Sequence, residues 1–349
     1  MNPQWQAFLQ DQGAVLEGGR VLHFGDPEAE RRAARDDDVL VEISELSLIR
    51  ARGADALGFL NGQLSNDLRL LDHSRSQLSS YNGPKGRMLA VFRVFRRGED
   101  YLLQLPAALA EEILKRLRMY VMRSKVTLEI ADHELQRIGI SGPRAEQLVR
   151  EAIGAAPADS DGCIARSEVT ALRLPGPLPR FELIAPTPDA MTLWKRLASQ
   201  VRRTGSPVWR WLDIQAGVPN VFPGTVEEFV PQMANLELLG GVDFKKGCYP
   251  GQEIVARMQY LGRLKQRMYR AQVQAPALPR PGDPLYAPAL SEQSVGLIVD
   301  AQSAPEGGYD LLAVIQIISA DGGGVRLGSL NGPLLVFRSL PYQVALPAA

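Results

Sequence analysis

The sequence predicts an α+β fold, in which sheets of split βαβ type carry helices on one face and a small β-barrel follows at the C-terminus. Between residues 39 and 200, segments with the two-residue period of strands alternate with segments that have the period of helices. From Gln266 onward, short strand-like segments recur between Gly and Pro turns. The length of 349 residues is enough for about two or three domains with cores of their own.

Alternating apolar and polar residues predict the strands of the first part, and apolar residues three and four apart predict its helices. Residues 1–38 are polar and interrupted by Gly and Pro, so they predict an extended segment with one short helix. The strands are predicted at Val39–Ala51, Met88–Phe95, Tyr101–Leu105, Lys125–Ile130, Gln136–Ile140, Ser167–Leu174 and Arg180–Ile184. The helices are predicted at Ala54–Leu64, Ala107–Met122, Arg144–Ile153, Asp189–Gln200 and Pro207–Ala216.

Residues 217–250 are rich in Gly and Pro and predict a long irregular segment. Such a segment inside a compact domain is usually functional or disordered, and its many apolar residues argue against disorder. A helix is predicted to begin at Gly251 and to run through Leu261. The composition changes near Leu264, where we place the boundary of the barrel. Its strands are predicted at Met268–Gln274, Val295–Asp300, Leu311–Ile318, Val325–Leu327 and Leu334–Phe337.

The charge balance argues against a nucleic-acid-binding protein. Lys and Arg together number 39, as do Asp and Glu, so no net field attracts DNA or RNA from a distance. Met1–Ala14 lacks the pattern of a secretory signal. The most apolar stretch, Leu311–Ile318, is far shorter than the roughly 20 residues of a membrane helix. We therefore expect a cytoplasmic protein without a membrane partner and without direct DNA binding.

Cys163 and Cys248 are the two cysteines, and no Cys or His cluster has the spacing of a metal site. Cys248 lies in Lys245–Glu253, a glycine-containing loop that leads into the predicted helix. A helix N-terminus and neighbouring lysines both stabilise a thiolate, which serves as a nucleophile, a cluster ligand or a redox group. The alternative is a small buried cysteine in a tight loop, and the residues alone favour neither interpretation. We interpret Cys163, which has no such surroundings, as structural.

A basic stretch of Arg263, Lys265, Arg267 and Arg270 follows the helix. It forms either an anion site, for a polyglutamate tail or an RNA phosphate, or an ordinary solvated surface. The second explanation is the more common one for such charges.

Several motifs resemble, in order and spacing, those of the YgfZ family. The central one spans Asn235–Arg257 and contains the family signature at Lys246–Tyr249 and Gly251–Glu253. The other matching segments are Gly53–Asp55, Phe59–Leu64 with Asp67, Gly83–Met88, Tyr120–Val126 and Ala216–Pro219. Several ordered motifs are much less likely to arise by chance than one.

The YgfZ family is similar to the T-protein of glycine cleavage, an aminomethyltransferase. The resemblance implies a T-protein-like ring of three domains around tetrahydrofolate or a derivative. We assign the domains to residues 1–52 with 125–264, to an inserted 53–124, and to the barrel at 265–349. The resemblance also implies a folate-binding protein needed by iron–sulfur client enzymes, including one that thiolates tRNA, so that any effect on tRNA is indirect.

The chain departs from its relatives at several positions. The aminomethyltransferases carry an acidic pair where this chain has Met88–Phe92, and an apolar strand supplies no general base. Gln215 replaces a glutamate that contacts the pterin, and an amide accepts hydrogen bonds only at its oxygen. Trp209 matches a folate-contacting tryptophan or is an ordinary core aromatic. A second family tryptophan is replaced around Leu46.

These observations predict an accessory protein rather than an enzyme, one that binds folate and supports iron–sulfur cluster assembly or repair. The alternative is a tetrahydrofolate-dependent aminomethyltransferase in which Glu253 or the thiol replaces the missing acid. Direct RNA binding through the basic stretch is the weakest hypothesis. The predicted functional residues are Cys248 as the thiol, with Lys246 and Glu253, and the predicted folate contacts are Trp209, Gln215, Tyr249, Gln252 and Arg257.

Overall fold

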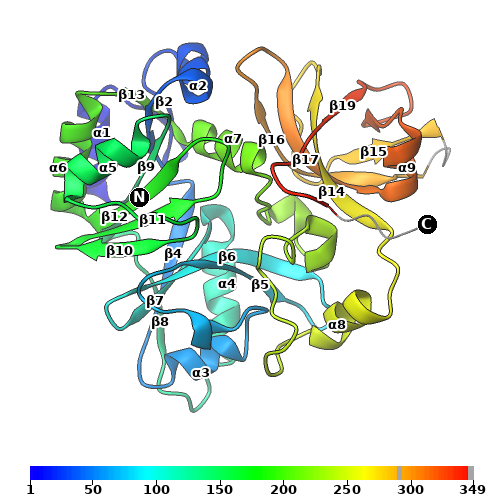
Figure 1. Ribbon diagram of the computed structural model, residues 1–349, viewed down its shortest axis with the longest axis horizontal. Coiled ribbons are helices and arrows are strands. Elements are labelled where there is room, and N and C mark those ends of the chain that lie inside the picture. Colours follow the sequence, from blue (N-terminus) through cyan, green and yellow to red (C-terminus); the bar gives the residue numbers. More distant parts are fainter. Residues whose placement is uncertain (289–292, 345–349) are drawn as a thin grey trace. The chain divides into compact units, whose positions relative to one another are not determined.

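The computed structural model describes residues 1–288 and 293–344 (Figure 1). The chain divides into two compact units. Unit 1 contains Met1–Phe59, Arg69–Gln77 and Arg93–Leu212, and unit 2 contains Leu60–Leu68, Leu78–Phe92 and the chain from Asp213 onward. The three predicted domains stay a prediction.

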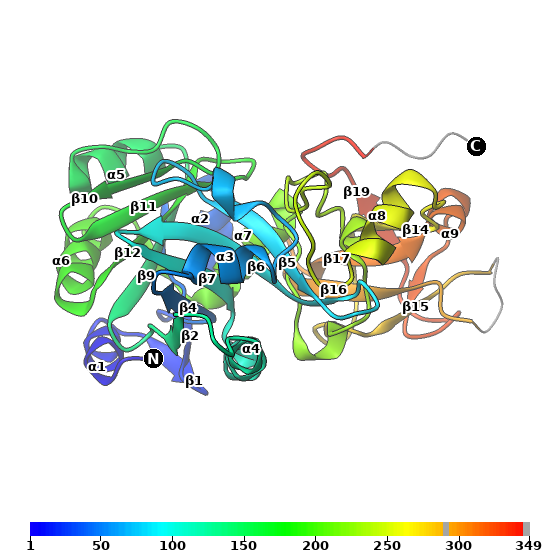
Figure 2. The same ribbon diagram turned by 90° about the horizontal axis from the view of Figure 1, so that it is seen from below.

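Helices occur in both units. They are α1 (Pro3–Asp11), α2 (Pro27–Asp36), α3 (Ala56–Asn61), α4 (Ala107–Met119), α5 (Ala145–Ile153), α6 (Thr187–Ala198), α7 (Ser206–Ala216), α8 (Gln252–Tyr260) and α9 (Ile317–Gly322), with the 3-10 turns η1 (Leu68–Leu70), η2 (Pro223–Thr225) and η3 (Pro231–Ala234). α8 follows the predicted irregular segment and is drawn in yellow in Figure 2.

The strands preceding α7 are β1 (Val15–Glu17), β2 (Arg20–His23), β3 (Val39–Glu42), β4 (Leu46–Arg52), β5 (Gln77–Asn82), β6 (Met88–Arg97), β7 (Asp100–Pro106), β8 (Thr127–Ile130), β9 (Leu135–Ser141), β10 (Cys163–Arg166), β11 (Val169–Leu174), β12 (Arg180–Pro186) and β13 (Arg202–Thr204). The later strands are β14 (Gln266–Val273), β15 (Pro284–Tyr286), β16 (Gly296–Ser303), β17 (Tyr309–Gln316), β18 (Arg326–Leu327) and β19 (Leu335–Arg338).

Unit 1 contains a six-stranded sheet in the order β10-β11-β12-β9-β3-β13. Only β13 pairs in parallel, with β3. Helices α1, α5 and α6 lie over one face of this sheet (Figure 1), where Trp5, Phe181 and Trp194 belong to one core cluster. Trp209 and Leu212 of α7 belong to a second cluster with residues such as Val41, Leu172 and Ile184. The alternation along β12 therefore supplies a core on each face. The chain also contains a five-stranded sheet in the order β5-β6-β7-β4-β8, whose β5 and β6 include residues assigned to unit 2.

Unit 2 contains a six-stranded antiparallel sheet in the order β18-β15-β16-β17-β14-β19, curled into a half-barrel. Its core includes Ala271, Val273, Ile298, Leu311 and Ile315. The predicted C-terminal sheet is therefore present, with one additional short strand, β15. No helix in the described part of the chain is long and apolar enough to cross a membrane.

Two predictions for the N-terminal part are wrong. Val39–Ala51 is not one strand, because β3 and β4 belong to different sheets. Between them the buried Glu42 carboxylate accepts hydrogen bonds from the backbone N–H of Ser44 (3.0 Å) and from its hydroxyl (2.7 Å), which forms a turn that leaves the apolar alternation intact. Residues 1–38 contain two helices and a hairpin rather than one helix. α2 was missed because its buried face is small: Glu30, Ala33 and Ala34.

Candidate functional site

Cys248 is exposed, and the residues on both sides of it hold the loop in place. Lys246 and Tyr249 are buried, whereas Lys245 and Gly247 are exposed. The chain therefore carries the thiol outward between two anchored side chains. Cys163 is confirmed as a buried core residue of unit 1, where burial, together with the charge of Asp72, raises the pKa of its thiol to about 12.

Lys246 anchors the loop through its ammonium group. Its Nζ donates to the backbone carbonyls of Asn61 (2.7 Å), Leu64 (2.6 Å) and Asn66 (2.9 Å), at and beyond the end of α3. An ammonium group has three N–H bonds, which matches the number of these carbonyl acceptors. The same Nζ lies 5.3 Å from the centre of the Tyr249 ring. We therefore interpret Lys246 as a positioning residue for the loop rather than a group that acts on a substrate.

A second anchor is Asp243, which the sequence analysis did not single out. Its Oδ1 accepts hydrogen bonds from the backbone N–H groups of Lys245 (2.7 Å) and Lys246 (3.1 Å). The backbone N–H of Asp243 donates to the carbonyl of Ser65 (3.0 Å). The hydroxyl of Ser65 in turn donates to the carbonyl of Gly241 (2.7 Å). An Asp two residues before a lysine pair in a glycine-rich segment is a signal for such a turn.

Gly251 joins the cysteine loop to the turn at Gly83–Gly86. It is the N-cap of α8 and has a φ of 74°, in the left-handed region that favours glycine. A Cβ atom at Gly251 would lie 2.5 Å from the carbonyl oxygen of Gly83 and 2.5 Å from the Cα of Gly86. The cysteine loop and the Gly83–Gly86 turn, which are far apart in the sequence, are thus in backbone contact.

The other predicted residues of the signature differ in exposure. Burial, together with the nearby Asp243, raises the pKa of Tyr249 to about 12, so its phenol stays protonated at neutral pH. The amide of Gln252 donates to the carbonyl of Lys246 (3.4 Å). Glu253 and Arg257 are exposed on α8.

The two predicted pterin contacts have protein partners in the structure. Trp209 belongs to the core of unit 1, is only 2% exposed, and lies beneath the Arg180 guanidinium, 5.2 Å from the ring centre. In unit 2 the Gln215 amide donates to Asp310 (3.1 Å) and accepts from Arg270 (2.8 Å). Both side chains are engaged with protein groups, and their role as folate contacts stays a prediction.

The basic stretch after α8 is not one solvated surface, so the second of its two interpretations is wrong, and the anion site stays a prediction. Arg267 is buried, donates to the carbonyl of Gln232 (2.9 Å) and pairs with the Glu237 carboxylate. Arg270 is half-buried and bound to Gln215. Only Arg263 and Lys265 are exposed.

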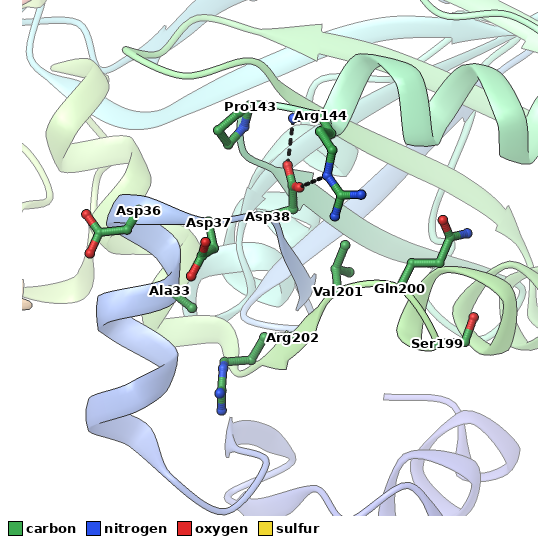
Figure 3. A pocket seen from close by; sticks show the side chains of 10 residues that line it. All are labelled: Ala33, Asp36, Asp37, Asp38, Pro143, Arg144, Ser199, Gln200, Val201 and Arg202. Atoms are coloured by element: carbon green, nitrogen blue, oxygen red, sulfur yellow. Dashed lines mark hydrogen bonds and ion pairs between the residues drawn. The ribbon is translucent and has the colours of Figure 1, made fainter.

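A cavity of about 570 Å³ lies in unit 1 (Figure 3) and contains none of the predicted site residues. In its wall, Asp38 accepts hydrogen bonds from the backbone N–H and the Nε of Arg144, both at 2.7 Å. The cavity is lined by Ala33, Asp36, Asp37, Asp38, Pro143, Arg144, Ser199, Gln200, Val201 and Arg202. Within residues 1–288 and 293–344, no group of three His, Cys, Asp or Glu side chains is placed to hold a metal ion.

Comparison with known proteins identifies the family. Residues 12–170 match the GCVT N-terminal domain. The chain is 31% identical, over 310 residues, to the tRNA-modifying protein YgfZ of Colwellia psychrerythraea, and the match covers 87% of this chain and 93% of that protein. This chain belongs to the YgfZ family. A second member, from Yersinia pseudotuberculosis, is 29% identical over 88% of this chain and 93% of its own length.

The fold of this YgfZ family member is that of a T-protein. The crystal structure of the glycine cleavage system aminomethyltransferase T from Bartonella henselae superposes with a TM-score of 0.79 and covers 98% of this chain and 97% of its own. The two sequences are 18% identical, so the likeness concerns the fold. It confirms the predicted α+β, T-protein-like fold class.

Proposed function

We propose that this protein is a folate-binding accessory factor that supports the assembly or repair of iron–sulfur clusters in client enzymes, including tRNA-modifying ones. The observation that carries the proposal is the exposed Cys248, held between the buried Lys246 and Tyr249. A thiolate is a ligand for iron and a nucleophile toward sulfur. An exposed thiol on a loop held by buried side chains can transfer iron or sulfur to a partner protein, which a structural cysteine in a core cannot do.

The strand that carries the acidic pair in aminomethyltransferases argues against transfer chemistry in this protein. Met88, Ala90 and Phe92 of β6 are buried and apolar, as are Leu89 and Val91 between them. No carboxylate is available there to take a proton or to stabilise a developing cation. We therefore propose an accessory role rather than catalysis.

Folate binding is proposed from the likeness of the fold, which is an analogy and not a contact. Of the predicted contacts, Arg257 has the chemistry and the exposure to bind a carboxylate of the glutamate tail. Trp209 and Gln215 would first have to leave their present partners. When bound, a reduced folate would supply a one-carbon carrier.

The thiol is tested by genetic rescue. A strain that lacks this protein is complemented with Cys248→Ser or with Cys163→Ala as the matched control, and the activity of an iron–sulfur tRNA-thiolating enzyme is measured. We expect the control to restore activity and Cys248→Ser to fail at equal protein levels. Full rescue by Cys248→Ser would contradict the proposed role of the thiol.

Folate binding is tested separately by titration calorimetry with tetrahydrofolate. We expect saturable binding by the wild type and weaker binding by Arg257→Ala and Trp209→Phe. The absence of binding heat would contradict the folate part of the proposal. Production of methylenetetrahydrofolate from an aminomethyl donor would instead support the aminomethyltransferase alternative.

A further inference from the structure

An exposed apolar strip follows Cys248 on helix α8. Ile254 is 38% exposed, Tyr260 is 67% exposed, and the C-cap residue Leu261 is 84% exposed. Single exposed apolar side chains are normal in proteins, but three within eight consecutive residues, directly after a candidate site, need an explanation.

One residue of the strip contacts the chain directly before the cysteine loop. The ring of Tyr260 meets that of Phe244 edge-on, with 6.1 Å between the ring centres, and Phe244 is four residues before Cys248. At the other end, a Cβ atom at Gly86 would lie 2.9 Å from the Cβ of Ile254, so Ile254 packs on the Gly83–Gly86 turn that also contacts Gly251. We call the surface of Phe244, Cys248, Ile254, Tyr260 and Leu261 the α8 face.

Positive charge accompanies the α8 face. Lys85 on the turn, Lys245 in the loop, Arg257 on the helix, and Arg263 and Lys265 after it are all exposed. In the part of the chain that the structure describes, none of these five side chains forms an ion pair with an acidic residue.

The acidic residues of this region do not offset that charge. Between Leu238 and Lys265 they are Asp243 and Glu253. The Asp243 carboxylate already accepts from two backbone N–H groups of the loop. This leaves Glu253 on the helix and Glu227, whose carboxylate lies beside Gly83 of the turn, as exposed carboxylates against the five exposed basic side chains.

We propose that the α8 face is the docking surface for an acidic patch on the iron–sulfur protein that Cys248 serves. This inference rests on the proposed function and adds the partner's chemistry and the place of contact. An apolar centre with a charged rim is the usual anatomy of a protein interface. Complementary charge would steer the encounter and set the orientation of the thiol toward the partner.

A protein fits this surface better than RNA does. Proteins that bind single-stranded RNA use aromatic side chains whose open ring faces stack on the bases. They also have a basic groove that follows the RNA backbone. Ile254 and Leu261 are aliphatic, and Tyr260, although 67% exposed, stands edge-on to Phe244 rather than in a row of parallel ring faces. The balanced net charge of the whole chain also supplies no long-range attraction for a polyanion.

The test measures binding of the full-length protein to a purified iron–sulfur tRNA-thiolating enzyme from the same organism. Two variants, called the α8 variants, disrupt the α8 face and its basic rim: Leu261→Asp and the charge reversal Arg263→Glu. Both alter exposed side chains, so the fold should tolerate them. The matched controls are Leu278→Asp and Arg280→Glu, which change exposed residues of the same kinds elsewhere in unit 2.

We expect each α8 variant to weaken binding by about tenfold or more, the size of a single interface anchor, and each control by less than about twofold. Wild-type binding should weaken with salt. Equal binding by all variants, or no binding by the wild type, would overturn the docking surface. So would binding of tRNA alone that is lost in the α8 variants and falls steeply with salt.

The outcome is separable from that of the proposed function. Cys248→Ser leaves the apolar strip and the basic rim in place, so it should bind the enzyme like the wild type and yet fail in the rescue assay. Rescue by Cys248→Ser with binding still lost in the α8 variants would refute the thiol and leave the docking surface standing. If Cys248→Ser failed in the rescue assay and the α8 variants bound the enzyme like the wild type, the thiol would stand and the docking surface would be refuted.

Discussion

Lys246 is a charged residue of the family signature whose ammonium group donates hydrogen bonds to the backbone. The sequence places it two residues from Cys248, which predicts a group that stabilises the thiolate. In the structure its ammonium group binds the carbonyls of Asn61, Leu64 and Asn66. Proximity along the chain therefore did not predict the direction of the side chain, because the acceptors come from residues about 180 positions earlier.

Replacing Lys246 with methionine should destabilise the protein. The change leaves three backbone carbonyls without their donor, and buried acceptors left unpaired cost about 1–3 kcal/mol each before water or rearrangement satisfies them. We expect the free energy of unfolding in urea to fall by roughly 2–4 kcal/mol. Lys245→Met, at an exposed position beside it, is the control and should change stability by less than about 0.5 kcal/mol. Equal effects of the two changes would contradict the anchoring role.

The two thiols should react at very different rates. Cys248 is exposed, whereas Cys163 is buried and the pKa of its thiol is raised to about 12. Because the thiolate is the reactive form, a disulfide reagent at neutral pH should modify one thiol quickly and the second only after unfolding. Cys248→Ser should abolish the fast phase, and Cys163→Ala should leave it unchanged. Two fast thiols in the native protein would contradict the burial of Cys163.

At the scale of elements, the start of α8 depends on a glycine for two separate reasons. Gly251 has a positive φ, and a Cβ atom there would overlap the backbone of Gly83 and Gly86. Gly240, earlier in the same segment, has a similar φ of 69° but no atom within 4 Å of a Cβ position. Alanine substitutions at Gly240 and Gly251 therefore distinguish the cost of backbone strain alone from the cost of strain combined with steric overlap.

Gly251→Ala should cost more than about 3 kcal/mol of stability, and Gly240→Ala only about 1 kcal/mol, the ordinary cost of a side chain in the left-handed region. Chemical denaturation measures both. Backbone atoms cannot rotate away as a flexible side chain can, which is why the overlap should dominate. A difference below about 1 kcal/mol would show that the turn at Gly83–Gly86 moves aside to admit the methyl group.

The elements that the sequence predicted well are those with a strong local period. α5, α7 and the β6–β7 hairpin agree with the predictions to within a few residues. The predicted Val39–Ala51 strand was wrong because the turn that divides it depends on the Glu42 side chain and not on Gly or Pro. β13 has three residues and owes its place to parallel pairing with β3, which leaves no periodic signal.

At the scale of the whole molecule, the sequence predicted which loop carries the thiol but not what holds that loop. The signature around Cys248 is contiguous, so its motifs were visible in the sequence. Its supports come from Asn61–Asn66 and from the Gly83–Gly86 turn, segments that no spacing rule links to it. Long-range contacts of this kind follow from topology, which local patterns do not determine.

This dependence makes unit 2 a poor candidate for expression as a continuous fragment. The chain from Asp213 onward lacks Leu60–Leu68 and Leu78–Phe92, the two segments that complete the unit. Without them, Lys246 loses its three acceptors and Gly251 loses the backbone that it contacts. A buried charge without partners costs several kcal/mol, a large part of the roughly 5–15 kcal/mol by which a domain is stable.

We therefore expect residues 213–344 alone to lack a cooperative thermal transition and to show little amide protection around Cys248. Fusing residues 60–92 ahead of this fragment through a flexible linker should restore both, because it returns the acceptors of Lys246 and the Gly83–Gly86 turn. Circular dichroism and hydrogen exchange measure the two properties. A short fragment that unfolds cooperatively at the midpoint of the full chain would show that the curled sheet of β14–β19 holds the cysteine loop without those supports.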